Sequence, residues 1–195
     1  MKYKAKYSKS GNIPIVILFG EHECGHDLEN KLFAKFDEMG LVILETSNNS
    51  KNREKFSKIN NYNLDEIKSL LFLLKKTSGA DKILILGIKL ANAMAFCDIE
   101  ISTDPKLKNS SLAVISNNIF SDMGNYKTNL QPLNWNNTIV KKFHDENEGV
   151  IGLQFNISRS LLGETKLVNE NSETSFQEIF RFVIYALAGL LSPIF

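Results

Sequence analysis

A short segment of the chain, residues 22–27, gathers most of the side chains that can bind a metal or transfer a proton. The chain has only 3 His and 2 Cys, and this segment holds two of the histidines, one cysteine and two acidic residues: His22, Glu23, Cys24, His26 and Asp27. Imidazole and carboxylate groups are the usual protein ligands of zinc, and they also serve as general acids and bases. We refer to residues 22–27 as the histidine segment and treat it as the candidate functional site.

The histidine segment stands between a predicted strand and a predicted helix. The apolar run from Pro14 to Phe19 precedes it and is typical of a strand buried on both faces. The run from Leu28 to Met39 follows it, with apolar residues at helical spacing. Open α/β sheets place their binding sites at the carboxyl ends of strands. We therefore expect the segment to lie in a cleft at that end of the first strand.

Taken literally, residues 22–26 satisfy the H-E-x-x-H pattern, in which two histidines on one helix face share a zinc ion and the Glu is the general base. The surroundings argue against this interpretation. The segment follows a strand almost directly, and Gly25 inside a helix would cost about 1 kcal/mol relative to Ala. The apolar stripe begins only at Leu28, which indicates that both histidines precede the regular helix.

Three other interpretations of the histidine segment stay open. In the first, a loop zinc site uses His22 with Glu23 or Asp27, and its third ligand comes from elsewhere in the chain, where His144 is the only other histidine. In the second, the histidines cap the following helix and bind no metal. In the third, Cys24 is a nucleophile activated by a neighbouring imidazole and by the helix N-terminus.

The remaining pattern predicts alternating strands and helices. Apolar runs at 82–87 and 149–157 indicate buried strands, and the alternation at 98–102 indicates a strand with one polar face. Helical spacing predicts helices from Asn63 to about residue 75 and from Ser175 to Leu191. We expect one α/β domain over residues 1–195, with a mostly parallel or mixed sheet flanked by helices.

Composition narrows the possible partners. A net charge of +1 offers no electrostatic attraction to nucleic acid or to an anionic membrane. The most apolar stretch, residues 179–195, contains Arg181 and Pro193 and is shorter than the roughly 20 residues that a membrane span needs. Two distant cysteines and the lack of an apolar leader segment favour a reducing, cytoplasmic location. We expect no nucleic-acid or membrane partner, and the sequence does not indicate an oligomeric state.

Three segments, in order along the chain, carry a resemblance. The first is the strand and the histidine segment, residues 15–27. The second is Ile85-Leu86-Gly87 followed by 98–103, which reads Asp-Ile-Glu-Ile-Ser-Thr, and the third is 154–159, which reads Gln-Phe-Asn-Ile-Ser-Arg. Together they resemble the N-formylglutamate amidohydrolase family and its relatives that hydrolyse poly-γ-glutamate. The resemblance implies a compact α/β, phosphorylase/hydrolase-like fold and a zinc-dependent amidase.

The resemblance also implies roles for individual residues. It places zinc on His22 and Asp27, with His26 beside them. It places a substrate carboxylate on Arg159, whose guanidinium can bind it bidentately. It places the general base on position 156, where the family has a Glu and this chain has Asn156. Glu23, the Glu of the H-E-x-x-H pattern, is the other catalytic candidate.

Two departures from the family pattern bear on activity. Leu86 stands where the family carries a metal-binding His, and Asn156 cannot accept a proton at neutral pH. Either the site is rebuilt from Glu23, His26, Glu100 or His144, or the hydrolytic activity has been lost. On this alignment, changing Leu86→His together with Asn156→Glu is predicted to raise zinc affinity.

Two functions follow. The first is a metal-dependent amidohydrolase acting on a small acidic amide or peptide, such as an N-acylglutamate or a γ-glutamyl bond, with a degenerate site. The second is a non-catalytic protein of the same fold that acts as a binding or assembly module. The sequence alone leaves open whether the chain is an enzyme.

Overall fold

The computed structural model of the chain describes residues 15–19, 42–44, 64–91, 94, 96–107, 111–130, 135–136, 138, 140–162 and 170–191. Within them a single mixed sheet is flanked by helices, as the sequence predicts. Its strands are β1 (Ile15–Phe19), β2 (Val42–Leu44), β3 (Ile83–Ala91), β4 (Ile99–Thr103), β5 (Thr128–Leu130) and β6 (Val150–Ser158). The longer helices are α2 (Leu64–Ser78), α3 (Ser111–Asn118) and α4 (Glu170–Leu191).

The order of the strands across the sheet is β2-β1-β3-β6-β4-β5. Strands β2, β1, β3 and β6 run parallel, and β4 is antiparallel to β6. The three apolar runs at 14–19, 83–87 and 149–157 are therefore interior strands of one sheet, as predicted. The carboxyl ends of β1, β3 and β6 consequently lie at the same edge, together with the first residues of β4.

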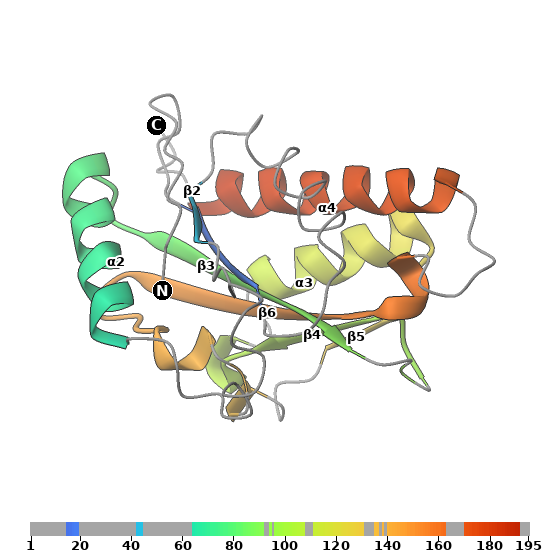
Figure 1. Cartoon of the computed structure of the whole chain (residues 1–195), viewed down its shortest axis with the longest axis horizontal. Coiled ribbons are helices and arrows are strands. Elements are labelled where there is room, and N and C mark those ends of the chain that lie inside the picture. The colour runs from blue at the N-terminus through green and yellow to red at the C-terminus, as the bar shows by residue number, and fades with distance from the viewer. Residues whose placement is uncertain are drawn as a thin grey trace, which may run out of the picture.

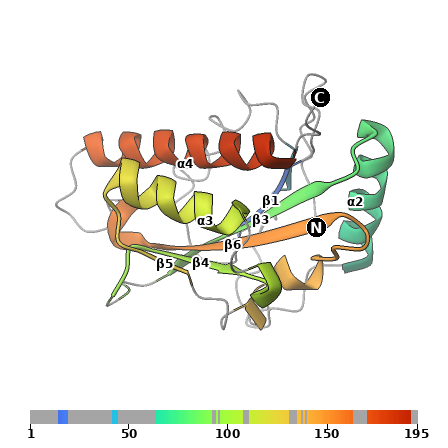
Figure 2. The same cartoon turned by 180° about the vertical axis from the view of Figure 1, so that it is seen from behind.

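One face of the sheet is covered by α3 and α4, which lie side by side in both views (Figures 1 and 2). Helix α4 buries the apolar stripe that the sequence predicts, against alternate residues of β3, β4 and β6. At the centre of this core, the Phe120 ring packs against the rings of Phe155, Phe176 and Phe180 at centroid distances of 5.9 to 6.2 Å. We call this side the α4 face.

The other face of the sheet is covered by α2 and by the short turn η5 (Val140–Lys142). Helix α2 buries Ile67, Leu71 and Leu74, as its helical spacing predicts, against Ile83 and Ile85. Further along β3, Gly87 is approached closely by the side chains of Gln154 and Val140, so that a Cβ at this position would collide with both. We call this side the α2 face.

The structure corrects three expectations: one strand boundary, the content of one segment, and the exposure of one strand face. β3 continues to Ala91 instead of ending at Gly87, because the small size of Gly87 makes room for neighbouring side chains inside the sheet. The stretch from 116 onward, irregular by its sequence pattern, contains the end of α3, a π-helical turn (Ile119–Met123) and β5. The polar face of β4 is less exposed than alternation suggests, because Ser102 is fully buried. The predicted helix at 28–39 lies outside the described residues.

Candidate functional site

A row of polar side chains crosses the carboxyl-end half of the sheet on the α2 face. In register, Lys89 of β3 pairs with Asn156 of β6, and Asn156 pairs with Glu100 of β4. Glu100 in turn pairs with Asn129 of β5. Paired residues of neighbouring strands project from the same face, so these four side chains form one line across four strands. We refer to them as the polar row.

The centre of the polar row is a hydrogen bond between an amide and a carboxylate. Asn156 Nδ2 donates to Glu100 Oε1 at 2.7 Å, and both side chains are half-buried. A hydrogen bond to an ionised acceptor is stronger than one between neutral groups, and partial burial reduces its competition with water. Asn156 therefore fixes the orientation of the Glu100 carboxylate.

Side chains alternate between the two faces of the sheet along β6. Phe155 and Ile157 are buried in the core on the α4 face, whereas Gln154 and Asn156 point to the α2 face. Arg159 follows directly, at the start of the turn η6 (Arg159–Leu162). Its backbone thus lies at the carboxyl end of β6, and its side chain is outside what the structure describes. The hydroxyls of Ser158 and Ser160 are 2.7 Å apart at the same place.

A second line of residues crosses the same face of the sheet, two residues nearer the amino-terminal end of β6 than the polar row. Gln154 pairs in register with Gly87 on one side and with Ser102 on the other. Gln154 Nε2 donates to the carbonyl of Phe155 at 3.3 Å. Among the residues that the structure describes, Gln154 Oε1 and the Ser102 hydroxyl have no hydrogen-bond partner. This line separates the polar row from the apolar core under α2.

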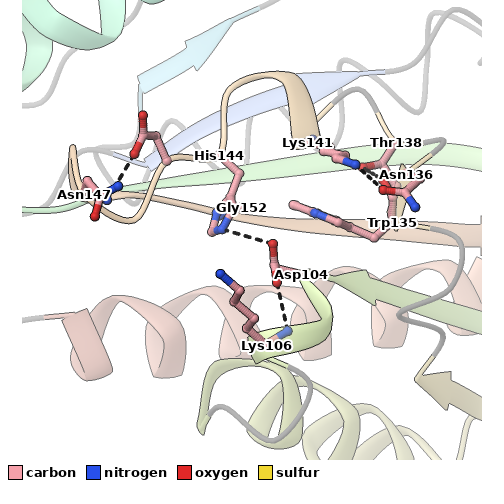
Figure 3. A network of polar contacts seen from close by, with 10 residues as sticks. Asp104, Lys106, Trp135, Asn136, Thr138, Lys141, His144, Asn147 and Gly152 are labelled. Carbon is pink, nitrogen blue, oxygen red and sulfur yellow. Dashed lines mark hydrogen bonds and ion pairs between the residues drawn. The ribbon is translucent and has the colours of Figure 1, made fainter.

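His144, the third histidine, lies away from the polar row, beside the amino-terminal half of β6. Its Nδ1 accepts a hydrogen bond from the Gly152 backbone N–H at 3.2 Å, so the ring proton is on Nε2, which lies 3.8 Å from Asp104 Oδ2. Figure 3 shows Asp104 between His144 and Lys106, whose backbone N–H donates to Asp104 Oδ1 at 2.8 Å. Gly152 precedes Asn156 by four residues, roughly 13 Å along a strand. His144 therefore ties the chain after η5 to the amino-terminal half of β6.

The residues predicted to bind a metal, His22, His26 and Asp27, lie outside the described residues, as does the catalytic candidate Glu23. The described part of this region is β1, which ends at Phe19, three residues before His22 in the sequence. In the part of the chain that the structure describes, no three His, Cys, Asp or Glu side chains are grouped so that they could hold a metal ion.

Leu86 lies away from the polar row. It is fully buried, with 0% of its surface exposed, and it belongs to the core on the α4 face together with Leu153 and Phe155. Asn156 is on the opposite face. It pairs in register with Lys89, and Lys89 and Leu86 project from opposite faces because they are three residues apart on one strand. The strand also continues for five residues beyond Leu86. In this chain, position 86 is thus a core position inside β3.

Cys97 lies two residues before the start of β4, and the charges at this edge of the sheet affect the pKa of its thiol. Burial raises the pKa of the Cys97 thiol above its usual value, and the negative charges of Glu100 and then Asp98 raise it further. Asp98 itself accepts a hydrogen bond from the Lys127 backbone N–H at 2.9 Å. A raised pKa lowers the thiolate fraction of Cys97, so we expect its reactivity to depend on the charge of Glu100.

We expect Cys97 to be alkylated by iodoacetamide at pH 8 at least about tenfold more slowly than glutathione, measured in a Cys24→Ser background. A raised pKa means a smaller thiolate fraction at this pH, and the thiolate is the reacting species. Glu100→Gln removes one of the charges that raise the pKa of Cys97, so alkylation should then be faster. Equal rates with and without the Glu100 charge would contradict this arrangement.

The described residues form an α/β fold on one mixed sheet, and the polar row lies at the carboxyl edge of that sheet. No family model matches the sequence, and no curated protein matches it significantly. Among solved structures, the chain is similar to an N-formylglutamate amidohydrolase from Ralstonia eutropha JMP134, with a TM-score of 0.62 and 12% identity. That match covers 97% of each chain.

Two further structures share the fold. The poly-γ-glutamate hydrolase of a bacteriophage matches with a TM-score of 0.55 and 13% identity, over 97% of this chain and 90% of the other. The catalytic domain of CwlV, an N-acetylmuramoyl-L-alanine amidase from Bacillus (Paenibacillus) polymyxa var. colistinus, matches with a TM-score of 0.50 and 10% identity, over 89% of this chain and 97% of the other. The remote resemblance predicted from the three sequence segments is thus confirmed at the level of the fold.

Proposed function

We propose that the chain is a metal-dependent amidohydrolase that cleaves a small acidic amide, such as an N-acylglutamate or a γ-glutamyl bond. The observation that carries this proposal is the polar row, in which Lys89, Asn156 and Glu100 are aligned at the carboxyl end of the sheet. Enzymes on α/β sheets bind their substrates at this edge. The structures that share the fold include hydrolases of formylglutamate, poly-γ-glutamate and muramoyl-alanine amides.

The residues of the histidine segment fit zinc by their chemistry. Two imidazoles, from His22 and His26, and the carboxylate of Asp27 are the kind of three-ligand set that catalytic zinc sites use. Bound there, zinc would supply Lewis acidity to the amide carbonyl and lower the pKa of a water molecule. Glu23 and Asn156 would then orient the reacting groups.

Binding of an acidic substrate requires a cation beside the reacting edge. Lys89 is exposed and pairs with Asn156, so its ammonium group is available next to the amide–carboxylate pair. Arg159 begins the turn after β6, two residues beyond Ile157. We assign both to the substrate carboxylate, Arg159 as the bidentate partner and Lys89 as a point charge.

The expected setting is cytoplasmic, with a small-molecule substrate and no nucleic-acid or membrane partner. None of the helices among the described residues is long and apolar enough to span a bilayer. We propose that residues 1–195 form a single domain.

Metal content and turnover test this function together. Protein purified without chelators and dialysed against zinc is expected to hold about one equivalent of zinc and to hydrolyse N-formyl-L-glutamate or a γ-glutamyl amide. His22→Ala should remove both the metal and the activity. His144→Ala is the matched control, because His144 Nδ1 is already engaged by Gly152, and it should retain zinc.

A metal-free wild-type protein that turns over neither substrate would rule out the enzyme. The second candidate function, a non-catalytic binding or assembly module, would then stand. The observation that favours it is the Asn156–Glu100 hydrogen bond, because an amide that is bonded to a neighbouring carboxylate has replaced the general base expected at position 156.

A further inference from the structure

The carboxylate missing from position 156 is present on the next strand. An Asn cannot take a proton from water at neutral pH, so position 156 cannot supply the base. Glu100 faces Asn156 from β4, one strand spacing of about 4.8 Å away, and its carboxylate is hydrogen-bonded to the Asn156 amide. β6 lies between β3 and β4 in the sheet (Figure 2). Because Glu100 pairs in register with Asn156, its side chain projects from the same face of the sheet.

We propose that Glu100 is the general base of this site and that Asn156 is the residue that positions it. This inference rests on the proposed amidohydrolase function and names the proton acceptor of that reaction. In this arrangement the base stands on β4 instead of β6, and the Asn156 amide on β6 holds the Glu100 carboxylate in place.

Several contacts hold Glu100 firmly at this position. The Asp98 carboxylate binds the Lys127 backbone N–H, and the Asp98 carbonyl accepts a hydrogen bond from the Ser158 backbone N–H at 2.8 Å. These bonds pin the start of β4 to β5 and to β6. On either side of Glu100 along β4, Ile99 and Ile101 are fully buried on the α4 face. The Glu100 side chain must therefore project toward the α2 face, beside Asn156.

The surroundings of Glu100 suit proton transfer. Its side chain is half-buried, so that it is partly shielded from bulk water and partly exposed to solvent. The exposed Lys89 lies two strands away in the same row and provides positive charge that balances the carboxylate and a bound anionic substrate.

The reaction balances with water as the only co-reactant. Glu100 takes a proton from water as the water oxygen forms a bond to the amide carbonyl carbon. The carbon–nitrogen bond then breaks, and Glu100 returns the proton to the departing nitrogen. The products are a carboxylic acid and an amine, and Glu100 is again ionised. The acid then gives its proton to the amine, which leaves a carboxylate and an ammonium group.

The test uses the full chain, with N-formyl-L-glutamate as the substrate and kcat, KM and the pH–rate profile as readouts. Glu100→Gln keeps the size of the side chain and an oxygen that accepts the Asn156 hydrogen bond, but it cannot take a proton. We expect kcat to fall by a factor of about 100 or more, with KM changed little and the acid limb of the profile lost. Glu100→Asp, which keeps a shorter carboxylate, should retain the acid limb at a lower kcat.

Asn156→Ala tests the positioning role and should lower kcat about tenfold, with the acid limb displaced but present. Glu178→Gln is the matched control, because Glu178 is exposed on α4, on the other side of the sheet, and should leave all readouts unchanged. Circular dichroism checks the fold of each variant. The alkylation rate of Cys97 reports the loss of the Glu100 charge independently of turnover.

Three outcomes overturn the inference, and they are distinguishable. If Glu100→Gln keeps kcat within about threefold and keeps the acid limb, the base is elsewhere and the amidohydrolase function stands. If Glu23→Gln removes the acid limb instead, the base belongs to the histidine segment. If the wild-type protein does not turn over the substrate, the proposed function and the role of Glu100 fail together.

Discussion

Replacing Leu86 by His is expected to destabilise the protein by about 3 kcal/mol and to leave zinc affinity unchanged. Leu86 is fully buried among Leu153, Phe155 and the aromatic side chains of α4. The substitution removes apolar contacts and buries an imidazole in a region where the surrounding side chains are hydrocarbon. The expected result differs from the sequence alignment, which assigns this position to a metal ligand.

Urea unfolding followed by circular dichroism measures the change in the free energy of unfolding. Leu73→His is the matched control, because Leu73 is 53% exposed on α2 and should tolerate the same substitution with little loss. Equilibrium dialysis against zinc gives the second readout. A Leu86→His variant that binds zinc more tightly than the wild-type protein, with its stability intact, would show that position 86 faces a metal site.

The interior of the fold was predictable because buried strands and helices have strong patterns of their own. β1 is wholly apolar, β3 is apolar except for Lys89, and β6 carries large apolar residues at alternate positions from Ile151 to Ile157. Helix α4 repeats apolar residues at three- and four-residue spacing. Apolar residues in these patterns can be removed from water only in a strand covered on its faces or in a helix packed along one side, so the patterns predict these elements. The order of these elements predicted the α/β class.

The elements that the sequence did not reveal are those that depend on their neighbours. β5 has only three residues, Thr128–Leu130, all half-buried, and it is a strand because it pairs with β4. Gly87 is typical of a turn in isolation, but inside β3 it admits the side chains of Gln154 and Val140. These are tertiary effects, and no local pattern encodes them.

The candidate site was predictable only in part, for a related reason. The alternation in 154–157 places Asn156 on one face of its strand, and this prediction is confirmed. The pairing of Asn156 with Glu100 depends on the antiparallel register between β6 and β4, which are separated by about fifty residues of sequence. The alternation within 98–102 marks Glu100 as facing away from the core, but no sequence signal identifies its partner.

Asn156→Glu is expected to produce a pair of carboxyl groups in contact, and to destabilise the protein at pH 7 by about 1 to 2 kcal/mol. The new side chain would replace the amide that now donates to Glu100 at 2.7 Å. Two carboxylates at this separation cannot both ionise without repulsion, so the pair should hold one shared proton near neutral pH. A Glu at position 156, which the resembled family carries, would therefore compete with Glu100 for a single proton.

The stability of the Asn156→Glu variant should depend on pH because of the repulsion between its two carboxyl groups. A carboxyl group whose charged form is disfavoured in the folded state binds its proton more tightly there than in the unfolded chain, so the destabilisation grows as the pH rises and disappears below roughly pH 4. Unfolding in urea at pH 4 and pH 7 measures it, and Asn129→Glu is the matched control, since Asn129 lies on the other side of Glu100 in the same row. In the control, the added charge also faces Glu100 but leaves the Asn156 hydrogen bond in place, so its pH-dependent loss should be smaller. Equal stability of Asn156→Glu and the wild-type protein at both pH values would mean that Asn156 and Glu100 are not in contact in solution.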